Sequence, residues 1–391
     1  MSMQRTQVAI IGAGPAGLML ARLLTLAKID VVVLERQSQA YVLGRIRAGL
    51  LESGTTDLLR EVGCGARLDA EGLVHDSASL NFNGESLEIN YLDLVGKSVT
   101  IYGQTEVTRD LMEANDASGI ACHYEAPVTG IDGLDGARVR LTYLTHGQQH
   151  TLDCDYVAGC DGFHGVGRAA IPPSVLKTYE RIYPFGWLGI LADVPPCGHE
   201  LIYANHPDGF ALATMRSNTR TRAYIQVPAD ARIEDWPDDR FWAEYKHRLG
   251  PVSKGVTTGP SIEKSIAPLR SFVAEPMRFG RLFLAGDAAH IVPPTGAKGL
   301  NLAASDVRYL SRALIAFYAS GDAGLIDAYS ETCLKRIWKA TRFSWWMTTL
   351  LHKFPDPDGF GSAMQRAEFE YLKSSRTAQV SLAENYVGLP I

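Results

Sequence analysis

The 391-residue chain has none of the sequence features that mark membrane, secreted or metal-binding proteins. No apolar run approaches the roughly 18–20 residues of a membrane-spanning helix. The first residues lead directly into an apolar strand pattern, so we expect no secretory leader. The six cysteines are scattered, without a Cys-x-x-Cys pair or a His/Cys spacing typical of a metal site. We therefore expect no metal ion, and reduced thiols in a cytoplasmic protein.

Charge and composition narrow the class of protein further. The formal net charge is −5 and no block of basic residues is present, so we expect no nucleic-acid partner. Hydrophobic residues make up 46% of the chain and charged residues 21%, which are proportions of a globular protein. The length allows two or three domains, and the chain has neither an internal repeat nor a low-complexity segment.

A glycine-rich turn near the N-terminus is the strongest motif in the chain. The apolar run Val8–Ile11 predicts a buried strand, and Gly12-x-Gly14-x-x-Gly17 and a helical pattern follow it. Gly12 permits a tight turn, Gly14 lets a pyrophosphate approach the backbone, and Gly17 lets the helix pack on the strand. Glu35 ends the next strand pattern and can accept hydrogen bonds from a ribose. This context predicts a bound dinucleotide, although the motif alone does not choose between FAD and NAD.

Three arginines follow this second strand pattern without neighbouring acids. Arg36, Arg45 and Arg47 stand close in sequence to Gln37 and Tyr41. One interpretation is a solvated loop. The other is a surface for the phosphates of a nucleotide, because a guanidinium offers forked hydrogen-bond donors.

The middle of the chain alternates between helix and strand patterns. Helical spacing is present over 50–68, 108–117 and 239–249, and Thr105 is placed to cap the second of these helices. Short alternating segments between 180 and 230 predict a second domain made mostly of antiparallel sheet.

The last third of the chain begins with another buried strand pattern. The strand over 281–287 ends in Gly286-Asp287, and a helix over 300–320 follows. The tail to residue 353 is helical and carries Trp338, Trp345 and Trp346. An aromatic helix face is more often part of a core or a subunit interface than a cofactor contact.

Three motifs in this order and spacing resemble the class A flavoprotein aromatic hydroxylases. They are the glycine-rich turn with Glu35, the turn Gly159-Cys160-Asp161-Gly162, and Gly286-Asp287. The resemblance implies that the first motif holds the ADP part of FAD. It also implies that Asp161 lies near both FAD and the nicotinamide nucleotide, and that Asp287 contacts the ribitol chain. Longer segments are similar to the family members that hydroxylate 4-hydroxybenzoate, and the similarity runs from residue 6 to 390: 41–49, 102–109, 154–165, 201–207, 265–273, 285–304 and 384–390.

The resemblance implies an α/β plus α+β fold in three parts. A Rossmann-like FAD-binding domain would be interleaved with a substrate-binding domain of mostly antiparallel sheet, followed by a helical C-terminal part that would form the interface of a homodimer. The expected boundaries are 1–70, 98–180 and 266–320 for the FAD-binding domain, 71–97 and 181–265 for the substrate-binding domain, and 321–391 for the C-terminal region.

Arg216 would bind the substrate carboxylate, with help from Thr214 and Tyr224. A guanidinium can hold a carboxylate by two parallel hydrogen bonds, and two hydroxyls can add more. Residues 214 and 216 share a face of a strand by alternation. The alternative is three polar residues on an exposed strand face. The family usually has Ser where Thr214 stands, so the fit of the substrate can differ slightly.

Tyr203, Tyr386 and His75 would carry the phenol proton of the substrate to solvent, with a water molecule between the last two. An imidazole titrates near neutral pH and can exchange a proton with water. Taken alone, His75 is more often a structural histidine. The resemblance also places the Pro294 carbonyl beside the substrate hydroxyl.

The other site residues follow from the resemblance alone. Those expected to line the substrate pocket are Leu50, Trp187, Leu201, Leu212, Thr295 and Ala297. Those expected at the flavin are Arg45, Arg47, Gln104, Lys298, Gly299, Leu300 and Asn301. Those expected at the nicotinamide nucleotide are Arg36, Gln37, Tyr41, His164 and Arg270.

The implied activity is conversion of 4-hydroxybenzoate to 3,4-dihydroxybenzoate with FAD, NADPH (or NADH) and O2. Two alternatives remain open at this point. One is hydroxylation of a related benzoate, such as 3-hydroxybenzoate or 3,4-dihydroxybenzoate, because a Val is common in the family where Leu50 stands. The other is a flavin-binding redox sensor without turnover.

Overall fold

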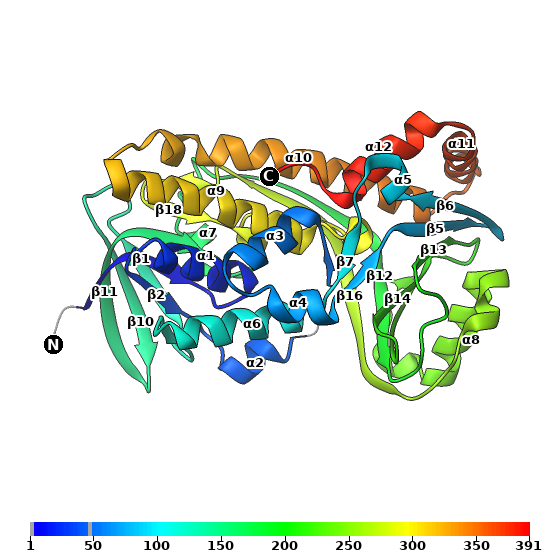
Figure 1. Cartoon of the computed structure of the whole chain (residues 1–391), viewed down its shortest axis with the longest axis horizontal. Helices are drawn as coiled ribbons and strands as arrows, with labels where there is room; N and C mark the ends of the chain where they lie inside the picture. Colours follow the sequence, from blue (N-terminus) through cyan, green and yellow to red (C-terminus); the bar gives the residue numbers. More distant parts are fainter. Residues whose placement is uncertain (1–3, 46–48) are drawn as a thin grey trace.

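The computed structural model describes residues 4–45 and 49–391, and it has two parts side by side along its long axis (Figure 1). One part is built around the sheet that carries the glycine-rich turn, and the other around a mostly antiparallel sheet. This arrangement confirms the predicted combination of an α/β and an α+β part. Within these two described ranges, no helix is both long and apolar enough to cross a membrane.

The first sheet has parallel strands at its centre. Its order is β17-β18-β11-β1-β2-β8, with β10 and β9 attached beside β11. Its strands are β1 (Gln4–Ile11), β2 (Val31–Leu34), β8 (Ala121–His123), β9 (Val128–Asp132), β10 (Val139–Thr145), β11 (Gln148–Gly159), β17 (Arg278–Phe279) and β18 (Leu282–Leu284). Because β1 is parallel to β2 and β11, and β11 is parallel to β18, the carboxyl ends of these strands lie along one edge.

Backbone hydrogen bonds hold the three sequence motifs together at that edge. The N–H of Cys160 donates to the carbonyl of Ile11 at 2.8 Å, and the N–H of Ala285 donates to the carbonyl of Gly159 at 3.0 Å. The turns that follow β1, β11 and β18 are therefore neighbours, although they are far apart in the sequence.

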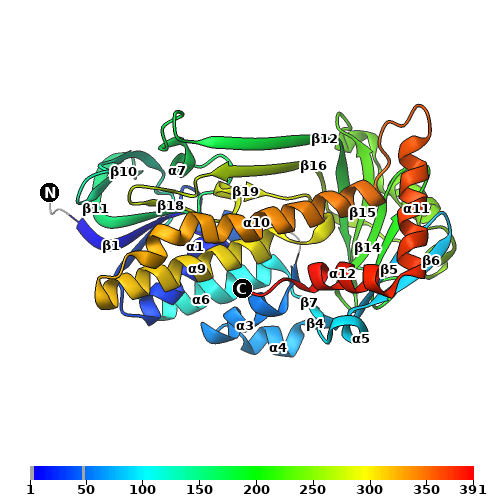
Figure 2. The same cartoon turned by 90° about the horizontal axis from the view of Figure 1, so that it is seen from above.

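Long helices pack around this sheet (Figures 1 and 2). Helix α1 (Pro15–Leu26) packs between α6 (Gln104–Ala117) and α9 (Gly299–Ser320), and α10 (Gly324–Leu351) packs on α9. The apolar side chains that the sequence pattern places on α1 are buried: Leu18, Leu20, Ala21, Leu23 and Leu24. The predicted helix over 300–320 is confirmed within one residue.

The second sheet has the order β19-β16-β12-β15-β14-β13-β5-β6. Its strands are β5 (Ser77–Phe82), β6 (Glu85–Asn90), β12 (Lys177–Ala192), β13 (Leu201–Asn205), β14 (Ala211–Ser217), β15 (Arg220–Pro228), β16 (Ser261–Glu275) and β19 (His290–Ile291). One face packs on helix α8 (Asp238–Leu249) through Phe241, Trp242 and Tyr245. The opposite face packs against α10, α11 (Phe360–Ser374) and α12 (Arg376–Val387).

Strands β12 and β16 run through both parts of the molecule (Figure 2). They pair antiparallel from Lys177 opposite Glu275 to Ala192 opposite Ser261, with an irregularity between Ile182 and Gly186. The predicted domain boundaries near 180 and 265 fall inside these two strands. The domain division stays a prediction, and the chain would pass between the domains within continuous strands.

Smaller elements differ from the sequence prediction in two places. The helical pattern over 50–68 is only partly confirmed, because β3 (Leu50–Leu51) pairs with β7 (Val99–Ile101), which also pairs with β4 (Leu73–His75). Helices α3 (Ser53–Glu61) and α4 (Ala66–Glu71) follow β3 as separate elements. The prediction of Thr105 as a cap is wrong, because the extended backbone of Gly103 lets α6 begin at Gln104. The remaining short helices are α2 (Gln39–Leu43), α5 (Tyr91–Val95) and α7 (Val166–Ala169).

A buried ion pair fixes the turn after β18 to α9. Nε2 of His290 lies 2.6 Å from Oδ2 of Asp306, and the N–H of Gly286 donates to the same oxygen at 3.0 Å. Both charged side chains are 1% exposed. Burial alone would lower the pKa of His290, but the Asp306 carboxylate outweighs it and raises that pKa above its ordinary value.

This pair predicts a pH-dependent stability. A raised pKa in the folded state stabilises the fold fully below the pKa of the unfolded histidine, and the contribution is lost as pH rises through the folded-state pKa. The free energy of unfolding in urea should therefore fall as the pH rises above neutrality. Asp306→Asn should lower stability at pH 6 and flatten the decline. The exposed substitution Asp230→Asn serves as the control, and the same decline in both variants would contradict the assignment.

Candidate functional site

The glycine-rich turn leaves space for a ligand at one of its three glycines. A Cβ at Gly12 would lie 2.4 Å from the carbonyl oxygen of Cys160, and φ of Gly12 is +103°. A Cβ at Gly17 would lie 1.9 Å from the carbonyl oxygen of Gly12. A Cβ at Gly14 would meet nothing within 4 Å. Two of the glycines are thus required by packing, and the third presents its backbone to open space.

The start of α1 and the Glu35 carboxylate adjoin this space. Gly14 is the N-cap, Pro15 begins the helix, and no side chain caps it, so N–H groups of the first turn remain available to phosphates. Oε2 of Glu35 accepts the N–H of Ala13 at 2.8 Å, and Oε1 accepts the N–H of Gln37 at 2.8 Å. Each oxygen keeps a lone pair, so Glu35 can still accept ribose hydroxyls.

The two motif aspartates lie at the same edge in different surroundings. Oδ2 of Asp161 accepts the N–H of Gly167 at 2.8 Å, while Oδ1 is buried without a partner. Burial raises the pKa of Asp161. Asp287 is exposed after Gly286, whose φ is +64°. A buried oxygen without a partner and an open glycine backbone are features that a dinucleotide such as FAD would satisfy.

The loop before α9 is held in a strained turn. The carbonyl of Pro294 accepts the N–H of Ala297 at 2.9 Å, and Ala297 has a left-handed φ of +52°. A Cβ at Gly299 would meet nothing within 4 Å, whereas Thr295 is fully buried and accepts a hydrogen bond from Thr348. Gly299 and Leu300, which is half-buried, begin α9 directly after this turn.

Asn301 and Lys298 are already engaged with other residues of the chain. Oδ1 of Asn301 accepts the N–H of Glu52 at 2.9 Å and the hydroxyl of Thr55 at 2.8 Å. Nζ of Lys298 donates to Oε1 of Glu52 at 2.6 Å, and Arg336 contacts the other oxygen of Glu52 at 2.9 Å. All three charged groups are at least nine-tenths buried. The predicted contacts of Asn301 and Lys298 with the flavin remain predictions.

The residues predicted for the nucleotide periphery lie mostly at the surface. Arg270 and His164 both contact the ring of Phe163, with the Arg270 Cζ 4.6 Å from its centroid and the two ring centroids 4.9 Å apart. Arg36 and Tyr41 are exposed, and Arg45 lies over the Tyr41 ring at 5.8 Å. Gln37 and Gln104 are half-buried. Arg47 lies outside the described residues.

One face of the second sheet gathers the predicted substrate residues. The register places Tyr203 opposite Leu212 and Leu212 opposite Tyr224. One row further along, Thr214 lies opposite Arg222. Directly opposite residues project from the same face of a sheet. By alternation along each strand, the same face also carries Trp187 and Leu201. The strand pairing is irregular at Arg216, whose guanidinium interacts with the hydroxyl of Tyr224 on this face.

Within the described part of the chain, Arg216 is a cation without an acidic partner. Its guanidinium donates to the carbonyl of Met215 at 2.9 Å, and burial lowers the pKa of Arg216. Burial alone would raise the pKa of Tyr224, but the charges of Arg222 and Arg216 beside its hydroxyl lower it. Arg222 forms an ion pair with Glu263, whereas among residues 4–45 and 49–391 no carboxylate pairs with Arg216. A buried cation in this state can bind an anion.

The apolar residues predicted for the pocket belong to one buried cluster on this face. The cluster includes Leu50, Trp187, Leu201 and Leu212, with Ala297 packed against it. Nε1 of Trp187 donates to Nε2 of His352 at 2.6 Å. Burial lowers the pKa of His352 to about 3, so its imidazole is neutral and can accept this hydrogen bond.

Two phenols meet at the inner end of the cluster. The hydroxyl oxygens of Tyr203 and Tyr386 lie 2.6 Å apart, and each side chain is 1% exposed. The ring of Tyr91 stacks on Tyr386 with centroids 4.7 Å apart. Burial, as the main cause, raises the pKa of Tyr203 and Tyr386 well above the usual range for tyrosine. Both hydroxyls therefore hold their protons at neutral pH and can pass one along a hydrogen-bonded pair.

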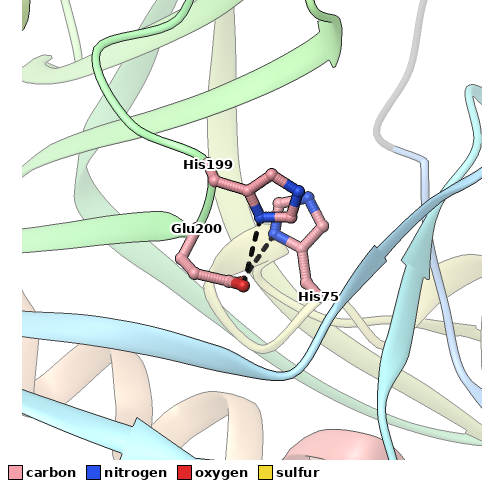
Figure 3. Close-up of side chains that lie close together, drawn as sticks. All are labelled: His75, His199 and Glu200. Atoms are coloured by element: carbon pink, nitrogen blue, oxygen red, sulfur yellow. Dashed lines mark hydrogen bonds and ion pairs between the residues drawn. The ribbon is translucent and has the colours of Figure 1, made fainter.

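His75 lies at the end of β4, close to Glu200 and His199 (Figure 3). Nδ1 of His75 lies 3.0 Å from Oε2 of Glu200, and Nδ1 of His199 lies 3.2 Å from Oε1. His75 is fully buried, and burial, with the neighbouring His199, lowers its pKa to about 4. His75 is therefore a neutral imidazole at pH 7.

Sequence reasoning missed several residues near the candidate site. Arg222 and Glu263 form an ion pair on the substrate face, and strand alternation from Tyr224 could have found the first of them. Glu52 and Tyr91 come from segments that follow no motif. Their roles depend on tertiary contacts with Lys298 and Tyr386, which a sequence pattern does not contain.

Comparisons with known proteins agree with this geometry. A family described as FAD binding domain matches residues 5–344. The p-hydroxybenzoate hydroxylase of Acinetobacter baylyi is 55% identical over 100% of this chain and 97% of its own. A rifampicin monooxygenase from Streptomyces venezuelae is 28% identical and covers 82% of this chain and 67% of its own. The crystal structure of a p-nitrophenol 4-monooxygenase from Pseudomonas putida has a TM-score of 0.85 at 22% identity over both whole chains, which shows the same fold.

The glycine-rich turn yields a paired prediction. Gly17→Ala forces a Cβ against the backbone and should destabilise the apoprotein by about 2–3 kcal/mol, as overpacking does. Gly14→Ala meets no atom, so the melting temperature of the apoprotein should hardly change, while FAD binding should weaken by about tenfold or more. Thermal unfolding of apoprotein and FAD titration by fluorescence measure both effects. Equal FAD affinity of Gly14→Ala and the unmodified protein would contradict the role of this open space.

Proposed function

This chain belongs to the FAD-binding family of flavoprotein aromatic hydroxylases, and we propose that it hydroxylates 4-hydroxybenzoate to 3,4-dihydroxybenzoate with NADPH and O2. The family match confirms the sequence-based prediction of FAD as the cofactor. The substrate and reaction are those named for the relative that is 55% identical over the full chain. The site supports the same choice independently of that name.

The observation that carries the proposal is the guanidinium of Arg216, which has no acidic partner among the residues that the structure describes. It lies on the same face as the hydroxyls of Thr214 and Tyr224, and apolar side chains flank it. A benzoate presents a carboxylate to such a cation and a flat apolar ring to such walls. The phenol pair of Tyr203 and Tyr386 offers hydrogen-bonding hydroxyls on the same sheet face. A ligand with a carboxylate at one end and a phenol at the other fits this arrangement.

The chain would orient the substrate and control its proton. Bound FAD, reduced by NADPH, supplies the activated oxygen that is transferred to the ring. Arg216 and Tyr224 would fix the carboxylate, and the buried apolar cluster would exclude water from the ring. The substrate phenol would donate its proton to the oxygen of Tyr203 while Tyr203 donates to Tyr386. The resulting phenolate activates the neighbouring ring carbon, where the hydroxyl group is added.

His75 would take the proton beyond Tyr386 through a water molecule. A neutral imidazole can accept a proton from one side and release one on the other. The carbonyl of Pro294 would lie beside the substrate hydroxyl and help to fix its direction. The roles of these two residues rest on the family resemblance and on the buried placement of His75.

We also propose a homodimer in the cytoplasm. Helices α10 and α11 expose large apolar side chains, among them Trp338, Trp345, Phe360 and Met364. Exposed apolar surface on neighbouring helices supports a subunit interface. All six cysteines are free thiols, which supports a reducing compartment.

Consumption of NADPH by the FAD-loaded protein, with and without 4-hydroxybenzoate, tests the function. Substrate should accelerate NADPH loss, and chromatography should show 3,4-dihydroxybenzoate in step with it. Arg216→Ala should weaken substrate binding by about 2–4 kcal/mol, because it removes the partner of a buried carboxylate. A panel with 3-hydroxybenzoate and 3,4-dihydroxybenzoate is run in parallel. Faster turnover of either compound than of 4-hydroxybenzoate would contradict the assigned substrate.

Tyr203→Phe tests the proton path separately from binding. The substitution removes one hydroxyl and keeps the ring, so the dissociation constant of 4-hydroxybenzoate should change little. Hydroxylation should fall by about a hundredfold, the low end of the contribution of a general acid or base, while NADPH is still consumed. The ratio of product formed to NADPH used measures this uncoupling. An unchanged ratio would remove Tyr203 from the proton path.

A further inference from the structure

Glu200 and His199 lie where the proposed proton path would reach the surface, and sequence reasoning gave them no role. Glu200 precedes β13, the strand that carries Tyr203, and His75 ends β4. The backbone N–H of Tyr91 donates to the carbonyl of Asp76 at 2.7 Å, which places the residue after His75 beside the ring stacked on Tyr386. His75, Glu200, Tyr91 and Tyr386 thus occupy one region of the fold.

The exposure of these side chains rises stepwise toward solvent. The side chain of His75 is 1% exposed, that of Glu200 is 29%, and that of His199 is 61%. The carboxylate lies beside the two imidazoles and contacts Nδ1 of each (Figure 3). The imidazoles stack with centroids 5.0 Å apart. A buried acceptor, a half-buried carboxylate and an exposed imidazole therefore follow one another within contact distance.

His75 has unused hydrogen-bonding capacity at this position. Nδ1 lies 3.0 Å from Oε2 of Glu200, but the two atoms are not aligned for a hydrogen bond. Both ring nitrogens of His75 and Oε2 of Glu200 are buried without a hydrogen-bond partner among the described residues. A small rotation of either side chain would align the pair. Buried polar atoms of this kind are expected to bind water or to exchange protons.

The charged surroundings favour Glu200 as the acceptor. The titratable groups around His75 are Asp76, His199 and Glu200, and Asp76 already accepts a hydrogen bond from Ser98 at 2.5 Å. The negative charge of Glu200 also contributes to the raised pKa of Tyr91 and Tyr386, after burial. Glu200 thus acts electrostatically on Tyr91 and Tyr386 and is in contact with His75.

We propose that Glu200 is the proton acceptor that connects His75 to solvent, and that it positions the imidazole for this transfer, with His199 as the outermost group. The proposal rests on the proposed function. As one proton arrives at Nε2 of His75, the Nδ1–H bond breaks and an O–H bond forms at Oε2 of Glu200. The imidazole ends neutral in its other tautomer. The Glu200 acid then releases the proton to water directly or through His199, and the carboxylate is restored.

Ionisation of bound 4-hydroxybenzoate, followed by phenolate absorbance after rapid mixing with the FAD-loaded protein, tests the proposal without NADPH or turnover. Glu200→Gln keeps the shape and loses the carboxylate, so phenolate should form at least about tenfold more slowly with an unchanged dissociation constant. Glu200→Asp should restore most of the rate, and added imidazole buffer should restore part of it in Glu200→Gln. Glu88→Gln, on the neighbouring strand β6, is the matched exposed control.

The outcomes separate this proposal from the function itself. If the unmodified protein fails to bind or ionise 4-hydroxybenzoate, the proposed function is wrong. If it ionises the ligand and Glu200→Gln does so at the same rate, only the role of Glu200 is overturned. If phenolate forms slowly in Glu200→Gln, and neither the Glu200→Asp variant nor added imidazole restores the rate, Glu200 has a structural role. That result would also overturn the proposal. If a chelator alone slows the unmodified protein tenfold, the three side chains hold a metal ion instead.

Discussion

Strand alternation in the second sheet is the constraint on which the proposed substrate site depends. Tyr203, Leu212 and Tyr224 lie in one row across three strands, and Thr214 and Arg222 lie in the next. A shift of any of these strands by one residue would turn its site residues toward α8 and its core residues toward the substrate. The packing of Phe241 and Trp242 on the opposite face therefore fixes the register of the binding site as much as the site residues do.

The two arginines of this face, Arg216 and Arg222, differ in whether a carboxylate of the chain neutralises their charge. Arg222 is 4% exposed and neutralised by Glu263. Arg216, on the adjacent strand, has only carbonyl and hydroxyl partners among the described residues. The charge of Arg222 is thus neutralised within the fold, whereas the charge of Arg216 remains for an anionic ligand to neutralise. Because an unpaired buried cation is unfavourable, this position would favour binding of a carboxylate over a neutral ring.

The sequence predicts the nucleotide part well because local rules determine it. The turn at Gly12 to Gly17, the acid at Glu35 and the later Gly-Asp turns all follow buried strand patterns, and parallel strands bring their carboxyl ends to one edge. The helix over 300–320 is similarly set by its own periodicity.

What the sequence does not predict depends on contacts between distant segments. Leu50 and Leu51 fit a helical pattern, yet pairing with β7 draws them into a strand. Glu52 is buried, and its carboxylate pairs with Lys298, which directly precedes α9, and with Arg336 of α10, both far away in the sequence. The substrate residues were placed by resemblance, and only the register shows that Arg222 shares their face.

The continuity of β12 and β16 has a consequence for how the molecule loses its structure. The two strands form one hydrogen-bonded ladder from the nucleotide part to the sheet that carries Tyr224. Loss of the hydrogen bonds between β12 and β16 would expose backbone groups in both parts at once. Unfolding of one sheet would therefore lower the stability of the other. We therefore expect the molecule to unfold as a single cooperative unit, so that cofactor binding at one end would also stabilise the proposed substrate site at the other.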